Sequence, residues 1–109
     1  MTSFRSEIAE KVKNRLPVEL RAAIDTRVEL GWKKYGQSLD DNIKTPRQKA
    51  VHLLQELMDA LQYVEWGGIT KPASKALVVS HLGDCIKIVL GENLDLTLDE
   101  LTWKEGYQE

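Results

Sequence analysis

The sequence predicts an all-α protein: a compact bundle of four helices with a short extra helix near the C-terminus. Apolar residues recur at helical spacing, and capping residues stand where the periodic segments begin or end. No segment shows the strict alternation of a half-buried strand. The chain has 109 residues, of which 42% are hydrophobic, so we expect residues 1–109 to form a single domain with its own core.

The first two helices are expected on either side of Pro17. An amphipathic helix over 3–15 is predicted by four apolar residues at four-residue spacing, namely Phe4, Ile8, Val12 and Leu16. The second is predicted over 18–34 and places near one face Leu20, Ile24, Val28 and Gly31. Gly36 is its expected stop, and the polar segment 37–44 is expected to be a loop.

The third helix begins at the T-P-x-Q sequence of 45–48, in which threonine caps the helix, proline fits its first turn and glutamine reaches back. It should extend to about Trp66, where Gly67 and Gly68 supply the flexible backbone of a helix end. Its core-facing stripe is Val51, Leu54, Leu57, Met58, Leu61 and Val64.

The fourth helix is expected over 73–90, with Gly91 closing it. It is so apolar that we expect it to be buried, within the chain or between subunits, and its Cys85 to be a buried structural thiol. The T-L-D-E sequence at 97–100 is a second capping box and predicts a short helix through Trp103.

A polar seam runs beside the apolar stripe of the third helix. Its members follow one another at steps of three or four residues: Lys49, His52, Glu56, Asp59, Tyr63 and Trp66. The carboxylates of Glu56 and Asp59 point the same way, and they repel each other unless a cation or a proton lies between them. This pair therefore indicates a cation site.

The second helix offers a matching acidic pair, Asp25 and Glu29. If the two helices fold back antiparallel about a turn near residue 41, Glu29 comes level with Leu53 and Asp25 with Leu57. Four carboxylates would then meet, a set that suits Mg²⁺ or Mn²⁺. The alternative is that these acids only solvate exposed faces or pair with nearby cations, namely Arg27, Lys33 and Lys49.

Basic and aromatic residues border this region and predict a nucleotide as ligand. They are Lys33, Lys34 and Tyr35 before the loop, and Lys49, His52, Tyr63 and Trp66 after it. Cationic groups balance phosphate charge, and an aromatic face stacks on a base. Helix packing is the alternative role for Tyr63 and Trp66. A second polar pair, His81 and Asp84, ranks below this site.

Composition excludes several other classes of protein. The net charge of −2 gives no polybasic surface for duplex nucleic acid, and one cysteine gives no disulfide framework. Neither the apolar core of a signal peptide nor an apolar run of membrane-spanning length is present, so we expect a cytoplasmic protein with no membrane partner. No Ser-His-Asp order, glycine-rich phosphate loop or cysteine-metal spacing occurs.

The sequence E-L-M-D-A-L-Q-Y-V at 56–64, preceded by G-W-K-K-Y-G at 31–36, resembles the MazG-like all-α nucleoside triphosphate pyrophosphohydrolases, and in particular their small phage and prophage members. The resemblance covers about residues 18–66. It implies helical dimers or larger homo-oligomers that cleave dNTPs or NTPs to monophosphate and pyrophosphate with Mg²⁺. By position, Glu56 and Asp59 would be metal ligands, and Lys33, Lys34 and Tyr35 would lie near the triphosphate.

The chain departs from that family at the second acidic pair. The family carries E-x-x-E on the preceding helix, whereas this chain reads E-L-G-W at 29–32. We expect Glu29 to act with Glu56 and Asp59 in catalysis, and Asp25 to replace the missing metal ligand from one turn earlier. The alternative is a phage protein that binds and sequesters a nucleotide without cleaving it.

A third hypothesis is a helical module that docks a protein partner. It rests on aromatic residues near predicted helix ends, namely Trp66, Trp103 and Tyr107. Whatever the function, we expect a homo-oligomer, because short helices with so apolar a fourth member leave surface that a second copy must cover.

Overall fold

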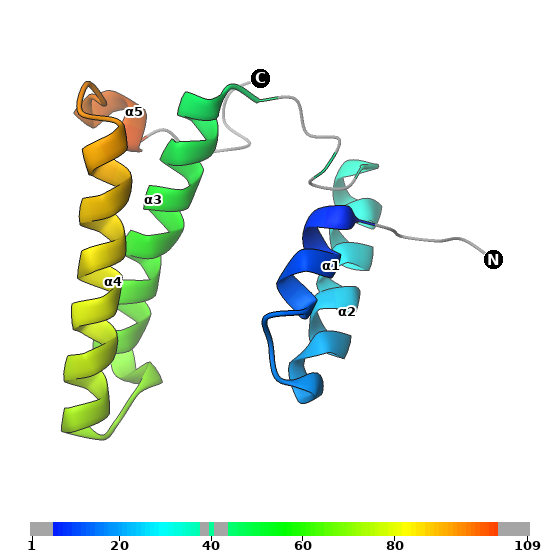
Figure 1. The fold of residues 1–109 in the computed structure, drawn as a ribbon, viewed down its shortest axis with the longest axis horizontal. Coiled ribbons are helices and arrows are strands. Elements are labelled where there is room, and N and C mark those ends of the chain that lie inside the picture. The colour runs from blue at the N-terminus through cyan, green and yellow to red at the C-terminus, as the bar shows by residue number, and fades with distance from the viewer. Residues whose placement is uncertain (1–5, 38–39, 41–43, 103–109) are drawn as a thin grey trace. The chain divides into compact units, whose positions relative to one another are not determined.

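The computed structural model describes residues 6–37, 40 and 44–102. The elements are α1 (Glu7–Lys13), α2 (Val18–Tyr35), α3 (Pro46–Tyr63), the π-helical turn η2 (Val64–Gly68), α4 (Pro72–Glu92) and α5 (Leu98–Thr102) (Figure 1). Over these ranges the structure holds helices and no strand, which confirms the all-α prediction.

The chain divides into two compact units, Met1–Ile43 and Lys44–Glu109. In the first, α1 packs against α2; in the second, α3 packs against α4, η2 and α5. The position of one unit relative to the other is not determined (Figure 1). The predicted single bundle, with α2 antiparallel to α3, therefore stays a prediction.

Helix α1 is held at its start by an acid that follows α2 in the chain. Ser6 caps the helix by accepting the N–H of Ala9 at 3.1 Å. The Asp40 carboxylate accepts the Ser6 hydroxyl at 3.0 Å and the N–H groups of Glu7 and Ile8. Of the predicted helix over 3–15, the first three residues lie outside the described ranges, and the helix begins only after Ser6.

The C-terminal end of α1 comes at Lys13, two residues earlier than predicted. Arg15 and Leu16 donate instead to carbonyls three residues back, those of Val12 and Lys13. The cause is Pro17, which disfavours helical backbone at the residue before it and so tightens the last turn.

Helix α2 stops at the predicted residue, Gly36, and its last helical residue is Tyr35, one beyond the predicted range. Gly36 has a φ of 73°, and its N–H donates to the Trp32 carbonyl at 2.8 Å. A residue with a Cβ is disfavoured in this left-handed conformation, so the glycine fixes the position of the stop.

The start of α3 is the predicted capping box. Thr45 accepts the Gln48 N–H at 3.1 Å, and Gln48 accepts the Thr45 N–H at 2.9 Å. The α-helix proper stops at Tyr63, and the chain continues as one π turn that contains Trp66. Gly67 has a φ of 130°, which fits the predicted glycine end.

The core of the second unit lies along the predicted stripe of α3. Val51, Leu54 and Val64 are buried. Two further members, Leu57 and Leu61, are half-buried. Met58 is exposed, so its assignment to the core was wrong.

Helix α4 is longer and more exposed than predicted. Gly91 lies inside it, and the closing residue is Asn93, whose side chain donates to the Val89 carbonyl at 2.8 Å. No residue of α4 is buried, and Leu77 and Ile88 are 62% and 64% exposed. Burial of this helix within the chain was therefore a wrong prediction, because only one of its faces packs on α3.

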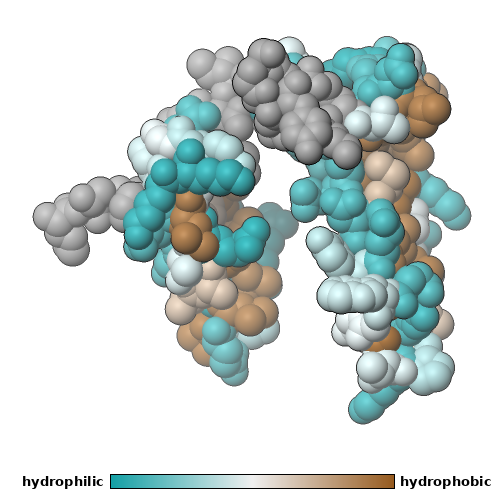
Figure 2. Space-filling model, turned by 180° about the vertical axis from the view of Figure 1, so that it is seen from behind, coloured by the Kyte–Doolittle hydropathy of each residue, from teal (hydrophilic) through white to brown (hydrophobic). Residues whose placement is uncertain are grey.

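Cys85 is exposed rather than buried. Apolar content made α4 look like core on every side, but hydropathy alone does not say which face a neighbouring helix covers. Apolar side chains, brown in Figure 2, remain on the surface of both units.

Helix α5 begins at the second predicted capping box. Thr97 accepts the Glu100 N–H at 3.2 Å, and Glu100 accepts the Thr97 N–H at 3.0 Å. The predicted end at Trp103 lies outside the described residues.

Candidate functional site

The candidate site is a line of polar and aromatic side chains along α3, here named the α3 seam. Its residues are Lys49, His52, Glu56, Asp59, Tyr63 and Trp66. The first five lie on α3, and Trp66 lies on the π-helical turn η2 that follows it directly. All except His52, which is half-buried, are exposed.

Glu56 and Asp59 form the acidic centre of the α3 seam. They are three positions apart, which corresponds to a rise of about 4.5 Å along the helix axis. Within the described parts of the chain, neither carboxylate takes part in a hydrogen bond or an ion pair. Two exposed carboxylates one turn apart can share a hard cation that completes its shell with water or phosphate oxygens.

The two acids of α2, unlike Glu56 and Asp59, form ion pairs. Asp25 accepts from Lys13 of α1 at 2.7 Å, and Glu29 accepts from Lys33 at 3.1 Å. The hydrogen bond that Lys13 donates to Asp25, followed by the one it donates to Glu10, raises the pKa of Lys13. In this structure both acids therefore pair with lysines, as one of the two sequence hypotheses proposed. Lys13 was not among the cations considered.

The basic residues of the predicted site stand at the C-terminal end of α2. Lys33, Lys34 and Tyr35 occupy its last turn and are exposed. The Lys34 ammonium lies 5.1 Å from the centre of the Tyr35 ring, within range of a cation–π contact. Lysines here also interact favourably with the negative end of the helix dipole.

The structure thus brings the predicted site residues together in two groups. One group lies on α2 in the first unit, and the α3 seam lies in the second. The expected meeting of the two acidic pairs stays a prediction. Within each unit, no three described His, Cys, Asp or Glu side chains gather as a metal site. A divalent ion on the α3 seam would therefore rely on Glu56, Asp59 and non-protein oxygens.

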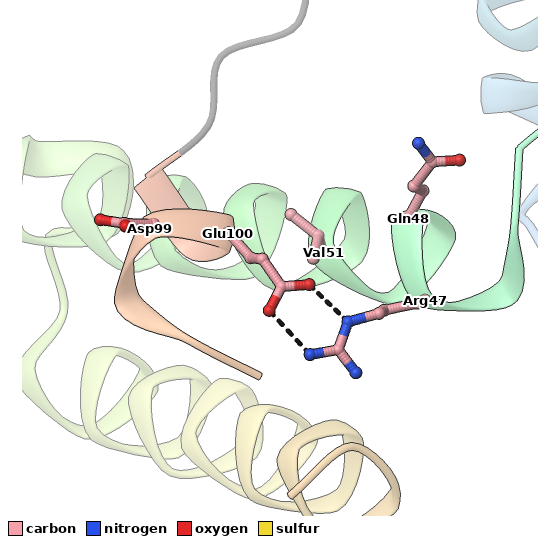
Figure 3. Close-up of a pocket in the computed structure, with 5 residues that line it drawn as sticks. All are labelled: Arg47, Gln48, Val51, Asp99 and Glu100. Carbon is pink, nitrogen blue, oxygen red and sulfur yellow. Dashed lines mark hydrogen bonds and ion pairs between the residues drawn. The ribbon is translucent and has the colours of Figure 1, made fainter. Parts of the chain in front are cut away.

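A cavity of about 310 Å³ lies where α5 meets the first turn of α3 (Figure 3). It is lined by Arg47, Gln48, Val51, Asp99 and Glu100. Arg47 grips Glu100 through two parallel hydrogen bonds, from Nε and from Nη2, the latter at 2.7 Å. It also donates to the Asp95 carboxylate at 2.8 Å and to the Asp95 carbonyl at 2.9 Å.

These contacts shift both charged groups toward their ionised forms. The Arg47 guanidinium lowers the pKa of Glu100 to about 2, with help from the Thr97 N–H. Glu100 and Asp95 in turn raise the pKa of Arg47. Because the Arg47 guanidinium is bonded to Glu100 and Asp95 of the same chain, we interpret Arg47 as a clamp that fixes α5 to α3. Sequence reasoning missed it, because no periodicity links residues 53 positions apart.

The pair His81 and Asp84 lies exposed on α4. No hydrogen bond joins the two side chains among the contacts of the described residues. The pair therefore adds no second site to the α3 seam.

In the ranges that the structure describes, no helix has both the length and the apolar content that a membrane crossing requires. Comparison with known proteins adds no relative: no protein-family model, no curated protein and no solved structure matches the chain.

Proposed function

We propose that this protein is a Mg²⁺-dependent (d)NTP pyrophosphohydrolase that releases a nucleoside monophosphate and pyrophosphate. One observation supports this above the others: Glu56 and Asp59 are adjacent, exposed and without a bonded partner in the described chain, whereas Asp25 and Glu29 are paired with lysines. Like charges one turn apart repel each other, and a bound divalent cation removes that cost.

In the proposed reaction Glu56 and Asp59 hold the metal ion, and one of them orients the attacking water. A bound Mg²⁺, or Mn²⁺ in its place, would stabilise charge on the leaving pyrophosphate and activate the attacking water. The predicted roles of Lys33 and Lys34 at the phosphates and of Glu29 at the metal, all on α2 in the first unit, stay predictions.

The test is pyrophosphate release from a panel of dNTPs and NTPs with Mg²⁺ or Mn²⁺. We expect metal-dependent release from at least one nucleotide, abolished by EDTA. Failure with every nucleotide and both metals at high protein concentration would overturn the proposal.

The second candidate is a protein that binds a nucleotide without cleaving it. It is favoured by the pairing of Asp25 with Lys13 and of Glu29 with Lys33. It is also favoured by Trp32, which stands where the E-x-x-E pattern of the MazG-like family has its second acid. A thermal-shift screen with linear and cyclic nucleotides decides, since a ligand that stabilises the fold and is recovered intact supports binding alone. No stabilisation by any nucleotide contradicts it.

The third candidate, a module that docks a protein, is favoured by large apolar side chains left in water. Trp66, Leu94 and Leu98 are 85%, 86% and 75% exposed. The other two aromatic residues of this hypothesis, Trp103 and Tyr107, lie outside the described residues. Capture of a specific partner in the absence of nucleotide supports this candidate, and capture only in its presence contradicts it.

A further inference from the structure

The α3 seam ends in two aromatic side chains that the fold leaves in water. Tyr63 is 62% exposed and Trp66 is 85% exposed. Their ring centres lie 6.4 Å apart, with the planes inclined at 53°. Tryptophan is on average a well-buried residue, because its large ring gains much from leaving water. An aromatic pair at this exposure is available to a planar ligand.

The turn that carries Trp66 is well defined. Gly67 has a φ of 130°, a region that residues with a side chain rarely adopt. A Cβ on Gly68 would lie 3.0 Å from the Tyr63 carbonyl oxygen. Gly68 is therefore favoured because a larger residue would crowd that oxygen. The Glu65 carboxylate also pairs with Lys75 of α4 at 3.0 Å. The two glycines and the Glu65–Lys75 ion pair thus define the turn in which Trp66 stands.

The order of side chains along the α3 seam matches the order of groups in a nucleotide. Trp66 lies seven residues beyond Asp59, and Lys49 lies seven residues before Glu56. Each interval spans about 10 Å of helix. An aromatic end and an acidic centre therefore follow one another at about 10 Å, as the base and the metal-bridged phosphates do in a nucleoside triphosphate, and Lys49 lies further along the same line.

We propose, on the basis of the function proposed above, that the nucleotide lies along α3 with its base stacked on Trp66, beside Tyr63, and its phosphates at Glu56 and Asp59. Recognition by stacking reads the face of the base rather than its edge. The site then takes all bases and favours purines, which offer the larger ring surface. The preferred substrate class is the purine nucleoside triphosphates.

The experiment is calorimetric titration of the full chain, with Mg²⁺, against three probes. They are the α,β-methylene analogues of dGTP and dCTP, which resist cleavage, and inorganic tripolyphosphate, which has no base. The variants are Trp66→Ala, Trp66→Phe and the matched control Leu94→Ala, which also removes a large exposed side chain but lies far along the sequence from the α3 seam.

We expect Trp66→Ala to weaken binding of the dGTP analogue by about tenfold or more, the usual effect of losing one base–aromatic contact. Trp66→Phe should keep most of the affinity, and binding of the dCTP analogue should weaken less. Tripolyphosphate binding should not change in either variant, and Leu94→Ala should bind all probes as the wild type does.

Two results would overturn the inference alone: nucleotide binding that survives Trp66→Ala, or equal loss of nucleotide and tripolyphosphate. The first means that the base lies elsewhere, and the second that Trp66 acts on the fold. If the wild type binds neither nucleotide nor tripolyphosphate, the proposed function itself has failed, and the inference fails with it.

Discussion

At the scale of single residues, the Glu56–Asp59 pair carries the chemical proposal. We expect Glu56→Gln or Asp59→Asn to lower metal-dependent pyrophosphate release by about a hundredfold or more, since each removes a ligand to the ion that stabilises the transition state. Both side chains are exposed and make no bond within the described chain, so the melting temperature should stay near that of the wild type. Rate and melting curve together check this.

The matched control for those two variants is Asp84→Asn, which neutralises an equally exposed acid on α4. Its rate should equal that of the wild type. An equal fall in rate for Asp84→Asn would mean that net charge, and not the α3 seam, governs activity.

Cys85 gives a second prediction at this scale. Because the thiol is exposed, a maleimide or a disulfide reagent should label it in the folded protein about as fast as in denaturant. Mass spectrometry of native samples over time measures the rate. Labelling that requires denaturant would show that this face of α4 is covered in solution, as the sequence first suggested.

The residue scale also shows what sequence can and cannot supply. The α3 seam follows from spacing alone, because a helix of known period fixes which side chains share a face. The partner of Asp25 could not be predicted from spacing, because Lys13 belongs to a different helix. Only the packing of α1 on α2 brings the Lys13 Nζ to 2.7 Å from the Asp25 carboxylate.

At the scale of elements, alanine substitutions at two glycines of the second unit should change stability in opposite directions, one through backbone strain and the other through helix propensity. Gly67→Ala should destabilise the fold by about 1–2 kcal/mol, because alanine is disfavoured at a φ of 130°. Gly83→Ala, in the interior of α4 with no atom within 4 Å of the new Cβ, should stabilise it by roughly 0.5–1 kcal/mol. Denaturant unfolding measures both, and a stabilising Gly67→Ala would contradict the structure of η2.

The clamp between α3 and α5 should depend on pH. Because the folded-state pKa of Glu100 lies at about 2, below its ordinary value of 4.5, its contribution to stability is present above pH 4.5 and is lost as pH falls toward 2. We expect Glu100→Gln to be less stable than the wild type at neutral pH, and the difference to shrink on acidification through that window. A difference that is constant between pH 7 and 2 would contradict the clamp.

Predictability at the element scale follows the range of the interactions. Both capping boxes and the Gly36 stop were predicted, because each is decided by residues within one helical turn. The site of the α4 end was missed by two residues, since Asn93 offers a side-chain bond that Gly91 lacks. The clamp could not be predicted, since it joins residues 53 positions apart.

At the scale of the whole molecule, the helical class was predictable and the arrangement of helices was not. Periodicity and composition decide that the described segments are helices. The predicted antiparallel pairing of α2 with α3 depends on the 37–44 segment, which carries no apolar period from which a register could be read. The meeting of the two acidic pairs rests on that helix pairing, so it is the part of the site that spacing alone leaves open.

The last prediction concerns association. Among the described hydrophobic residues only Val51, Leu54 and Val64 are buried, while large apolar side chains on α2, α4 and around α5 face water. So small a core within the two units leaves little free energy to offset chain entropy. We therefore expect the chain to form a homo-oligomer whose melting temperature rises with protein concentration, because association then contributes to folding. Light scattering and melting curves over a hundredfold concentration range measure both, and a monomer with a concentration-independent transition would contradict this expectation.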